Sequence, residues 1–334
     1  MAEQTRRPPF DPGYKNANGD PNPKRTIDIP ALRKGVSMSG MDKHSITQQH
    51  PQYQHSDITI PGVPSLDATP TTLALYQVRP TEAGLQQWPS GRPLIYHIHG
   101  GGQIAGDRFF GLTIPMSHFP PTANLVFASP EYRLAPEQRA PAGAIDVYAG
   151  LVYLVSHAAE LHIDPARIVL YGISGGAAVA ASAALLSRRE RGPRVCALVL
   201  DIPMLDDRRD GVVSQEQFRE GTLWPGWMDE QAWDAVLGDG DREDVDGVRV
   251  AGRAENLGGL PLTFIDVGEC ESMRDRAVEF ASKIWRDGGS AELHVWPGVY
   301  HGGAMFEPGV PVGEEMVRVQ KSFLERVLGF NADN

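Results

Sequence analysis

The pentapeptide at residues 172–176, Gly-Ile-Ser-Gly-Gly, constrains the fold more than any other part of this chain. It follows an apolar run at 168–171 that is typical of a buried strand, and it opens an alanine-rich run at 177–186 that is typical of a helix. A G-x-S-x-G motif between strand and helix forms a sharp turn that holds a serine hydroxyl at the end of an α/β sheet. Glycine suits this turn because the backbone is strained and its neighbours lie too close for side chains. The pattern makes Ser174 the candidate catalytic nucleophile.

The rest of the chain alternates strand patterns with helix patterns, which is typical of a mostly parallel sheet with helices on both faces. Several strand patterns are continuous apolar runs, as expected for strands that are buried on both sides. Strands are predicted at 57–60, 72–78, 94–99, 125–129, 168–171, 197–202, 262–267 and 291–296. Helices are predicted over 141–161, 177–186, 272–287 and 317–328, with Ser272 and Asp275 as an N-cap arrangement for the third. The sequence therefore predicts an α/β fold.

Two regions depart from this alternation. Residues 1–55 are rich in Pro, Asn, Gly and Gln, so we expect weak order or short helices there. Residues 206–256 are acidic and loop-like, and we interpret them as an inserted cap over the carboxyl ends of the strands, where α/β proteins bind ligands. The α/β core then comprises 56–205 and 257–334. The large apolar side chains of the cap suit its own core and a substrate pocket equally well: Trp224, Trp227, Met228 and Trp233.

The composition narrows the classes of partner and compartment. The chain has 334 residues and a formal net charge of −11, without a long stripe of basic residues. Nucleic acid and anionic membranes are therefore disfavoured as partners, and no apolar run is long enough to span a bilayer. The two cysteines, Cys196 and Cys270, do not make a disulfide framework, which favours a reducing compartment and hence the cytoplasm.

A serine hydroxyl is a weak nucleophile and needs a base within hydrogen-bonding reach, which in turn needs an orienting partner. In serine hydrolases of the α/β type, the acid and then the histidine follow the serine along the chain. Only two of the ten histidines follow Ser174. His294 lies within a predicted strand, whereas His301 lies in the loop at 297–303. Because a loop at a strand end can bring an imidazole over the serine, we predict that His301 is the base.

The acid is expected just after the predicted strand at 262–267. Asp266 is expected to lie inside that strand, and Asp275 is better explained as a negative charge at a helix N-terminus. Glu271 lies in the turn itself, with Glu269 as the main competitor. We predict that Glu271 fixes the imidazole tautomer and stabilises the imidazolium, without taking the proton.

The glycine-rich segment at 99–102, His-Gly-Gly-Gly, follows another predicted strand and can present unpaired backbone N–H groups to an oxyanion. We assign Gly101 and Gly102 as two donors and Gly175, the residue after the nucleophile, as the third. His99 itself is expected to hold the loop.

Three other interpretations of these residues are weaker. Gly100-x-Gly102-x-x-Ala105 loosely matches a dinucleotide-binding fingerprint, but Pro115 breaks the following segment and no acid lies about twenty residues on at a strand end. His97 could pair with His99 on a metal, but no third ligand with suitable spacing is apparent. Cys270 has no cluster that would stabilise a thiolate, so packing is expected. We therefore expect neither a metal nor a cofactor.

Taken together, five motifs resemble the hormone-sensitive-lipase-like esterases of the α/β-hydrolase superfamily, and the resemblance extends from about residue 10 to the end. The Glu-Tyr-Arg-Leu-Ala-Pro-Glu block is highly specific, whereas G-x-S-x-G alone would not be. The motifs are His-Gly-Gly-Gly at 99–102, Glu-Tyr-Arg-Leu-Ala-Pro-Glu at 131–137, Gly-x-Ser-x-Gly at 172–176, Gly-Glu-Cys-Glu-x-x-Arg-Asp at 268–275 and His-Gly at 301–302.

The chain also departs from the usual pattern of this family. Members usually carry Asp before the serine and Ala after it, where this chain has Ile173 and Gly175. Glu271 stands where Asp is usual, and Gln103 stands where a bulky apolar or aromatic residue often follows the glycines. The resemblance implies hydrolysis of short to medium acyl esters without a cofactor, a cap built from the N-terminal segment and an insertion, and a homodimer through a sheet edge. Gln103 joins Trp224, Trp227 and Met228 as candidate pocket residues.

The resulting hypothesis is a serine hydrolase that cleaves small carboxylic esters through an acyl-enzyme, with a Ser-His-Glu triad. A lactonase, deacetylase or amidase that is specialised for one metabolite is the alternative, motivated by Gln103, Gly175 and the aromatic cap. A ligand receptor on the same fold is a third reading, although such proteins are expected to lose the serine or histidine, which this chain retains.

Overall fold

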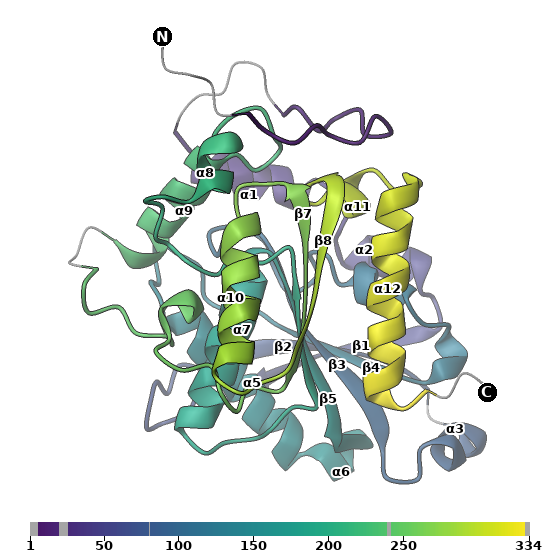
Figure 1. The fold of residues 1–334 in the computed structure, drawn as a ribbon. Helices are drawn as coiled ribbons and strands as arrows, with labels where there is room; N and C mark the ends of the chain where they lie inside the picture. The colour runs from purple at the N-terminus through teal and green to yellow at the C-terminus, as the bar shows by residue number, and fades with distance from the viewer. Residues whose placement is uncertain (1–5, 20–25, 80, 239–241, 331–334) are drawn as a thin grey trace.

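The computed structural model describes residues 6–19, 26–79, 81–238 and 242–330, and its centre is one eight-stranded sheet (Figure 1). The strands lie in the order β1-β2-β4-β3-β5-β6-β7-β8. β2 runs antiparallel to both of its neighbours, and every pairing from β4 to β8 is parallel. The strands are β1 (Tyr53–Ile60), β2 (Thr71–Val78), β3 (Arg92–Ile98), β4 (Val126–Pro130), β5 (Ile163–Ile173), β6 (Ala197–Asp201), β7 (Leu262–Cys270) and β8 (Ala291–Tyr300).

All eight predicted strands are present, and the predicted α/β fold is confirmed. The short apolar runs became strands because both of their faces are covered: every residue of β3, β4 and β6 is buried. β1 and β8, at the two edges of the sheet, are partly exposed along their length. Several strands are longer than predicted, since polar residues at their ends still pair with a neighbouring strand.

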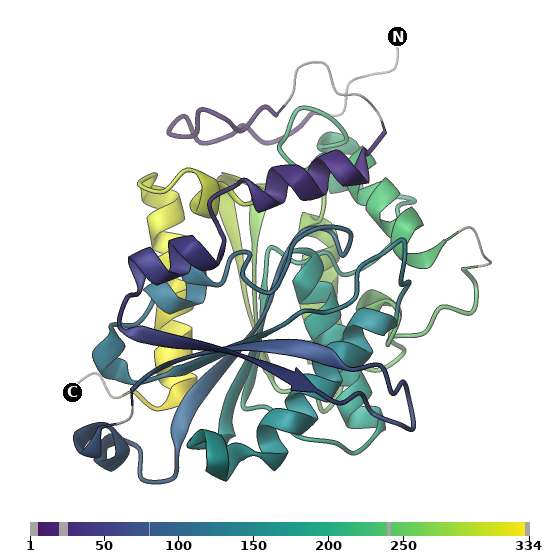
Figure 2. The ribbon, with the colours of Figure 1, turned by 180° about the vertical axis from the view of Figure 1, so that it is seen from behind.

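Helices cover both faces of the sheet (Figures 1 and 2). On one face, α5 (Ala142–Ser156), α7 (Gly175–Arg189) and α10 (Arg274–Arg286) pack their apolar sides onto alternate residues of the strands. On the other face, α2 (Lys43–Gln49), α4 (Thr113–Ser117) and α12 (Pro311–Leu328) pack onto the remaining alternate residues. Because strand side chains alternate between faces, the two apolar clusters are separated by the sheet itself.

Two details of the predicted helices are wrong. The single helix predicted over 141–161 is interrupted at His157, which leaves helical geometry (φ −108°, ψ 19°), so α5 ends before the short helix α6 (Ala158–Leu161). The imidazole of His157 hydrogen bonds to the carbonyl of Tyr153 at 3.0 Å, which stabilises this end of α5. Ser272 does not cap α10, whose N-cap residue is Met273. The Oγ of Ser214 accepts the Asp275 N–H of the first turn instead, at 3.2 Å.

A layer of N-terminal and inserted segments lies over the carboxyl ends of the strands, at the top of Figure 1. It contains α1 (Ile29–Ser37), which crosses behind, together with α8 (Val213–Gln217) and α9 (Gly226–Leu237). An apolar cluster joins this layer to the core: it contains Trp233 and Val236 of α9 together with Ala178 of α7, and Leu32 of α1 packs against it. Segments that are far apart in the sequence therefore form one cover over the sheet.

The connection from β4 to α5 is held by a largely buried ion pair. The guanidinium of Arg133 contacts both carboxylate oxygens of Asp146 at 2.9–3.1 Å, and its Nη1 donates to Asp67 at 2.7 Å. Asp146 lies inside α5 with its side chain 2% exposed. Burial raises the pKa of Asp146, and the hydrogen bonds from Arg133 oppose that rise. A carboxylate in such a place needs its partner, because desolvation is costly for an unpaired charge.

Replacing Arg133 with alanine is therefore expected to lower the free energy of unfolding by about 3–5 kcal/mol, because Asp146 would lose its counter-charge. Equilibrium unfolding in urea measures this difference. Arg318→Ala is the matched control, since its partner Glu315 is on the surface of α12 and the pair is exposed on both sides. We expect no measurable change for that control, and equal unfolding midpoints for the two variants would contradict the prediction.

Candidate active site

Ser174 lies at the sharp turn between β5 and α7 in a backbone conformation that is rare for a residue with a side chain (φ 54°, ψ −118°). Its backbone N–H donates to the carbonyl of Asp201 at 2.8 Å, which fixes the turn to the end of β6. A Cβ at Gly176 would overlap the carbonyl oxygen of His99, and one at Gly172 would lie 2.6 Å from the carbonyl oxygen of Gly176. The glycines of the motif thus permit close contact between two strand ends and hold the serine in place.

The structure brings Ser174, His301 and Glu271 into one hydrogen-bonded chain. The Oγ of Ser174 is 3.0 Å from Nε2 of His301, and Nδ1 of His301 is 2.5 Å from Oε2 of Glu271. The other oxygen of Glu271 accepts the Gly268 N–H at 2.7 Å, which orients the carboxylate. Ser174 and His301 are 7% and 6% exposed, and Glu271 is fully buried. The arrangement can transfer the serine proton to the imidazole in a site that is largely screened from water.

The other acids considered for this position have different partners. Glu269 points away from the imidazole, and its Oε2 accepts the Gly298 N–H at 3.1 Å. Asp266 lies inside β7, and Asp275 accepts the Ser214 N–H at 2.8 Å. His294 lies in β8, where it is 3.1 Å from Glu292. None of these side chains is bonded to His301.

The loop after β3 lies directly beside the serine. Gly101 and Gly102 adopt positive φ values of 107° and 63°, and the loop is closed by a bond from the Ala105 N–H to the Gly101 carbonyl at 3.0 Å. A Cβ at Gly175 would lie only 2.7 Å from the backbone nitrogen of Gly102 and 2.6 Å from that of Gln103. This chain therefore needs glycine, rather than the alanine that is usual in the family, where the turn meets the loop.

His99 holds this loop from below, as the sequence indicates. Its Nδ1 is bonded to the carbonyl of Gly100 at 2.8 Å, and its ring stacks on that of Tyr132 with centroids 4.2 Å apart. The hydroxyl of Tyr132 donates to the carbonyl of His99 at 2.8 Å. Tyr132 belongs to the specific block at 131–137, so one role of that block is to brace the glycine loop.

Of the candidate pocket residues, Trp224 lies beside the histidine. Its ring centroid is 6.3 Å from that of His301, and its ring lies against Gly102, where a Cβ would be 2.8 Å from it. Trp227 is buried and Met228 is partly buried, both in the first turn of α9. Trp224 is thus the one of these three that the contacts place beside the histidine and the glycine loop.

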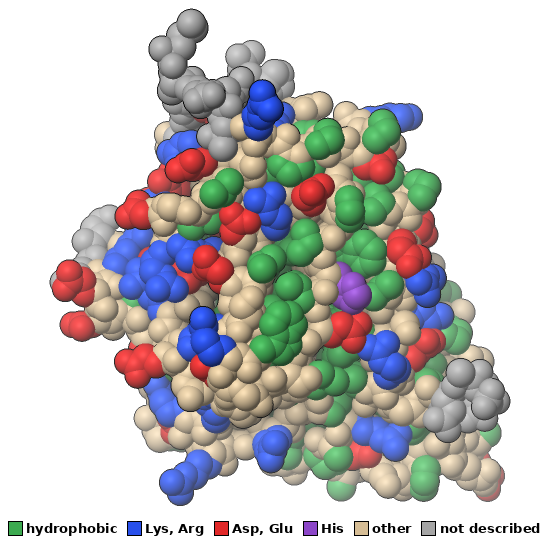
Figure 3. Space-filling model, in the orientation of Figure 1, with side chains coloured by type: hydrophobic (Ala, Val, Ile, Leu, Met, Phe, Trp, Pro, Cys, Tyr) green, Lys and Arg blue, Asp and Glu red, His purple; other side chains and the backbone are tan. Residues whose placement is uncertain are grey.

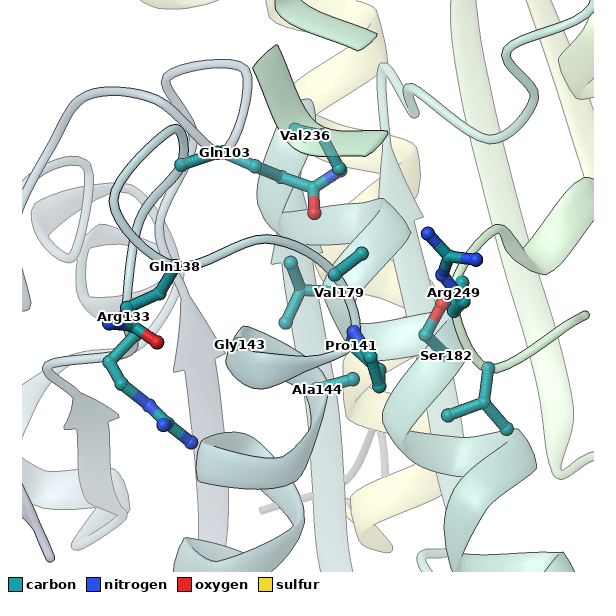
Figure 4. Close-up of a pocket in the computed structure, with 13 residues that line it drawn as sticks. Gln103, Arg133, Gln138, Pro141, Gly143, Ala144, Val179, Ser182, Val236 and Arg249 are labelled. Carbon is teal, nitrogen blue, oxygen red and sulfur yellow. The ribbon is translucent and has the colours of Figure 1, made fainter. Parts of the chain in front are cut away.

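Gln103 has a different place from the other three. Its side chain extends toward Val236 and lines a narrow pocket of about 10 Å³ with Val179 and Ser182 (Figure 4). The lining of this pocket does not include Ser174 or His301. A volume of this size accommodates at most one water molecule. The unusual Gln103 therefore packs behind the glycine loop.

Sequence reasoning missed two groups of buried carboxyls near the serine. Asp201, at the end of β6, and Asp266, in the middle of β7, are register partners. Burial raises the pKa of Asp201 to about 6, and burial together with the charge of Asp201 raises that of Asp266 well above its usual value. Asp229, in α9, is also buried. An aspartate in each of two apolar strands was a signal for the pair, whereas nothing local marks Asp229.

The structure also bears on metals and membranes. Among the residues that it describes, no group of three or more His, Cys, Asp or Glu side chains is arranged to hold a metal ion. His97 lies 3.2 Å from the hydroxyl of Ser129 within the sheet. In the same described ranges, no helix has the length and apolar character that crossing a membrane requires.

Comparison with known proteins agrees with this fold. A family model described as the alpha/beta hydrolase fold matches residues 95–305, and the chain belongs to that family. The resemblance to hormone-sensitive-lipase-like esterases is thereby confirmed.

Among curated relatives, the carboxylesterase NlhH of Mycobacterium tuberculosis is 31% identical over 254 residues, which cover 72% of this chain and 77% of NlhH. The esterase LipI of the same species is 25% identical over 282 residues, or 80% of each chain. Among solved structures, a bacterial heroin esterase has 29% identity and a TM-score of 0.77, with 90% of this chain and 92% of that chain covered. The esterase LipW of Mycobacterium marinum has 25% identity and a TM-score of 0.78, with coverage of 93% and 96%.

The contact at Gly176 gives a direct test of how tightly the turn and the glycine loop are packed. Gly176→Ala is expected to destabilise the protein by about 1–3 kcal/mol, because the new methyl group meets backbone that cannot move aside. Gly35→Ala is the control, since a Cβ at that position in α1 would meet no atom within 4 Å. Thermal unfolding followed by circular dichroism compares the two. If the Gly176→Ala protein unfolded at the same temperature as the wild type, this account of the packing would be contradicted.

Proposed function

We propose that this chain hydrolyses small carboxylic esters through an acyl-enzyme intermediate on Ser174. The observation that supports this most strongly is the continuous chain of hydrogen bonds from Ser174 through His301 to the buried Glu271. Its relatives include proteins named carboxylesterase and esterase, which is the same reaction class.

In the first half of the reaction, Oγ of Ser174 attacks the ester carbonyl while Nε2 of His301 takes the hydroxyl proton. Glu271 holds the imidazole by Nδ1, so that Nε2 faces the serine, and its charge stabilises the imidazolium that forms. Because Glu271 is fully buried and its second oxygen is bonded to the Gly268 N–H, the imidazole is oriented before the substrate arrives.

The negative charge that develops on the carbonyl oxygen needs donors that are already in place. The backbone N–H groups of Gly101, Gly102 and Gly175 are the donors in this proposal. The close approach of Gly175 to the glycine loop supports it, since it gathers these amides beside Ser174. His301 then returns its proton to the leaving alcohol, and a water molecule activated by the same imidazole releases the acyl group.

The proposed substrates are esters with short to medium acyl groups, bound under a cap formed by residues 1–55 and 206–256 above a core of 56–205 and 257–334. The proximity of Trp224 to both His301 and Gly102 supports this, because it places an aromatic surface where the two parts of an ester must lie. We also propose that the protein forms a homodimer, which the family resemblance implies, and that it is located in the cytoplasm, which its two cysteines favour.

Replacement of Ser174 by alanine is expected to lower the turnover of 4-nitrophenyl acetate by roughly 10⁴-fold or more, since the attacking group is removed. The fold should be retained, because the substitution removes one oxygen and leaves the packing of the turn intact. A fluorophosphonate probe should label the wild type at Ser174 and should leave the variant unlabelled. Near-wild-type activity of Ser174→Ala would contradict the proposal, and so would failure of the wild type to react with the probe.

The choice of acid can be tested with a pair of neighbouring glutamates. Glu271→Ala is expected to reduce kcat by about 10³- to 10⁴-fold, because the imidazole loses its orientation and the charge that stabilises the imidazolium. Glu269→Ala is the matched control and should change kcat less than about tenfold, since Glu269 bonds to Gly298 and not to His301. Steady-state kinetics with one ester measures both variants. The reverse order of effects would transfer the role to Glu269.

A further inference from the structure

The cap contains a carboxyl group that the hydrolytic chemistry does not use. Asp229, in the first turn of α9, is 1% exposed. Its Oδ2 accepts a hydrogen bond from Nε2 of Gln215 at 2.7 Å, whereas its Oδ1 is buried without a hydrogen-bonding partner. Buried carboxylate oxygens are almost always paired, so an unpaired one needs an explanation.

Positive side chains near Asp229 do not satisfy that oxygen. Of the positive side chains, Arg209 lowers the pKa of Asp229 most, but its two terminal nitrogens are bonded to Glu230 and Asp234 at 2.9–3.0 Å. Its Nε is buried and makes no hydrogen bond to Oδ1 of Asp229. Burial raises the pKa of Asp229 to about 7, and Gln215 and Arg209 only partly oppose that rise. A cation beside the free oxygen would favour the ionised carboxylate and would remove much of the cost of burying it.

The geometry of α9 directs Asp229 toward the reacting groups. Ala232 is three residues further along the helix, on the same face, and it packs against the position of Gly102, where a Cβ would be 3.4 Å away. His301 is near enough that a positive charge on its imidazole would lower the pKa of Asp229. Asp229 therefore lies on the side of the cap that faces the serine and histidine.

One indole ring lies on the side of the cap to which Asp229 belongs. Trp224 lies beside His301, and its ring and Ala232 both lie against Gly102. Trp227, two residues before Asp229, lies on the other face of α9. The face of an indole attracts a cation, most strongly where water is excluded. The formal net charge of the chain, −11, also favours the approach of positively charged small molecules over anionic ones.

We propose that Asp229 and Trp224 form a recognition site for a substituted ammonium group, so that the preferred esters of this enzyme carry a positive charge. This inference rests on the proposed esterase function and adds the class of substrate. Oδ1 of Asp229 contacts the ammonium group, and the indole face of Trp224 contacts its alkyl substituents.

The test compares two esters that differ in charge but have nearly the same shape. One is 4-(trimethylammoniomethyl)phenyl acetate, and the other is 4-neopentylphenyl acetate, in which carbon replaces the charged nitrogen. The quantity measured is the ratio of kcat/KM for the charged ester to that for the neutral ester. We expect a ratio above one for the wild type, and a ratio at least about tenfold lower for Asp229→Asn, because the substitution removes the charge and keeps the shape.

Glu230→Gln is the matched control. It makes the same change of charge at the next position of α9, but Glu230 is paired with Arg209 and Arg219. We expect this variant to keep the wild-type ratio. An equal fall of the ratio in both variants would assign the effect to overall charge, and an unchanged ratio in Asp229→Asn would assign Asp229 a structural role. Either result would overturn the proposed ammonium site.

A binding measurement separates this inference from the esterase proposal. Benzyltrimethylammonium should bind to the Ser174→Ala protein, and its affinity should fall by about tenfold or more in the Ser174→Ala, Asp229→Asn double variant. Calorimetric titration measures both affinities. If the wild type cleaved neither acetate but the ammonium ion bound in this Asp229-dependent way, the esterase proposal would fail and the ammonium site would stand. Absence of binding in an enzyme that cleaves both acetates would overturn the ammonium site alone.

Discussion

The close contact between the turn at Ser174 and the glycine loop after β3 is the constraint on which the rest of the site depends. Gly176 lies against the carbonyl of His99, and Gly175 lies against the backbone of Gly102, at distances that leave no room for a Cβ. The ends of two neighbouring strands can therefore place a hydroxyl and a group of backbone amides side by side. Because backbone atoms make this contact, its geometry is rigid, as electrostatic stabilisation of an oxyanion requires.

The block at residues 131–137 shows how such a loop is supported from outside. Tyr132 stacks on His99, Arg133 joins α5 to the segment before β2, and Glu137 is bonded to Arg33 of α1 at 2.7–2.8 Å. One short segment thus connects the glycine loop, a helix of the core and a helix of the cap. Its specificity as a sequence motif has a physical cause, since each side chain has a different partner.

Several buried carboxyl groups lie near Ser174, some in the sheet and one in the cap. Glu271 is bonded to His301, Asp201 and Asp266 are partners in the neighbouring strands β6 and β7, and Asp229 lies in α9 of the cap. Burial of so many acids opposes stability unless each is paired, protonated or in contact with a cation. Glu271 is paired with His301, the mutual repulsion of Asp201 and Asp266 favours a proton between them, and we assign an external cation to Asp229.

The sequence by itself determined the sheet, the turn at Ser174 and the order of serine, acid and histidine, because apolar runs, glycines and loop positions are local signals. It did not determine where side chains on turns and helices point. Glu271 and Glu269 are two residues apart at the end of one strand, and only the irregular pairing of β7 with β8 brings the first to His301 and the second to Gly298. The tertiary structure likewise placed Gln103 in the small pocket beside Val236, and Asp229 on the face of α9 that packs on the glycine loop. Both placements depend on the packing of α9 against a loop that is more than a hundred residues earlier in the chain.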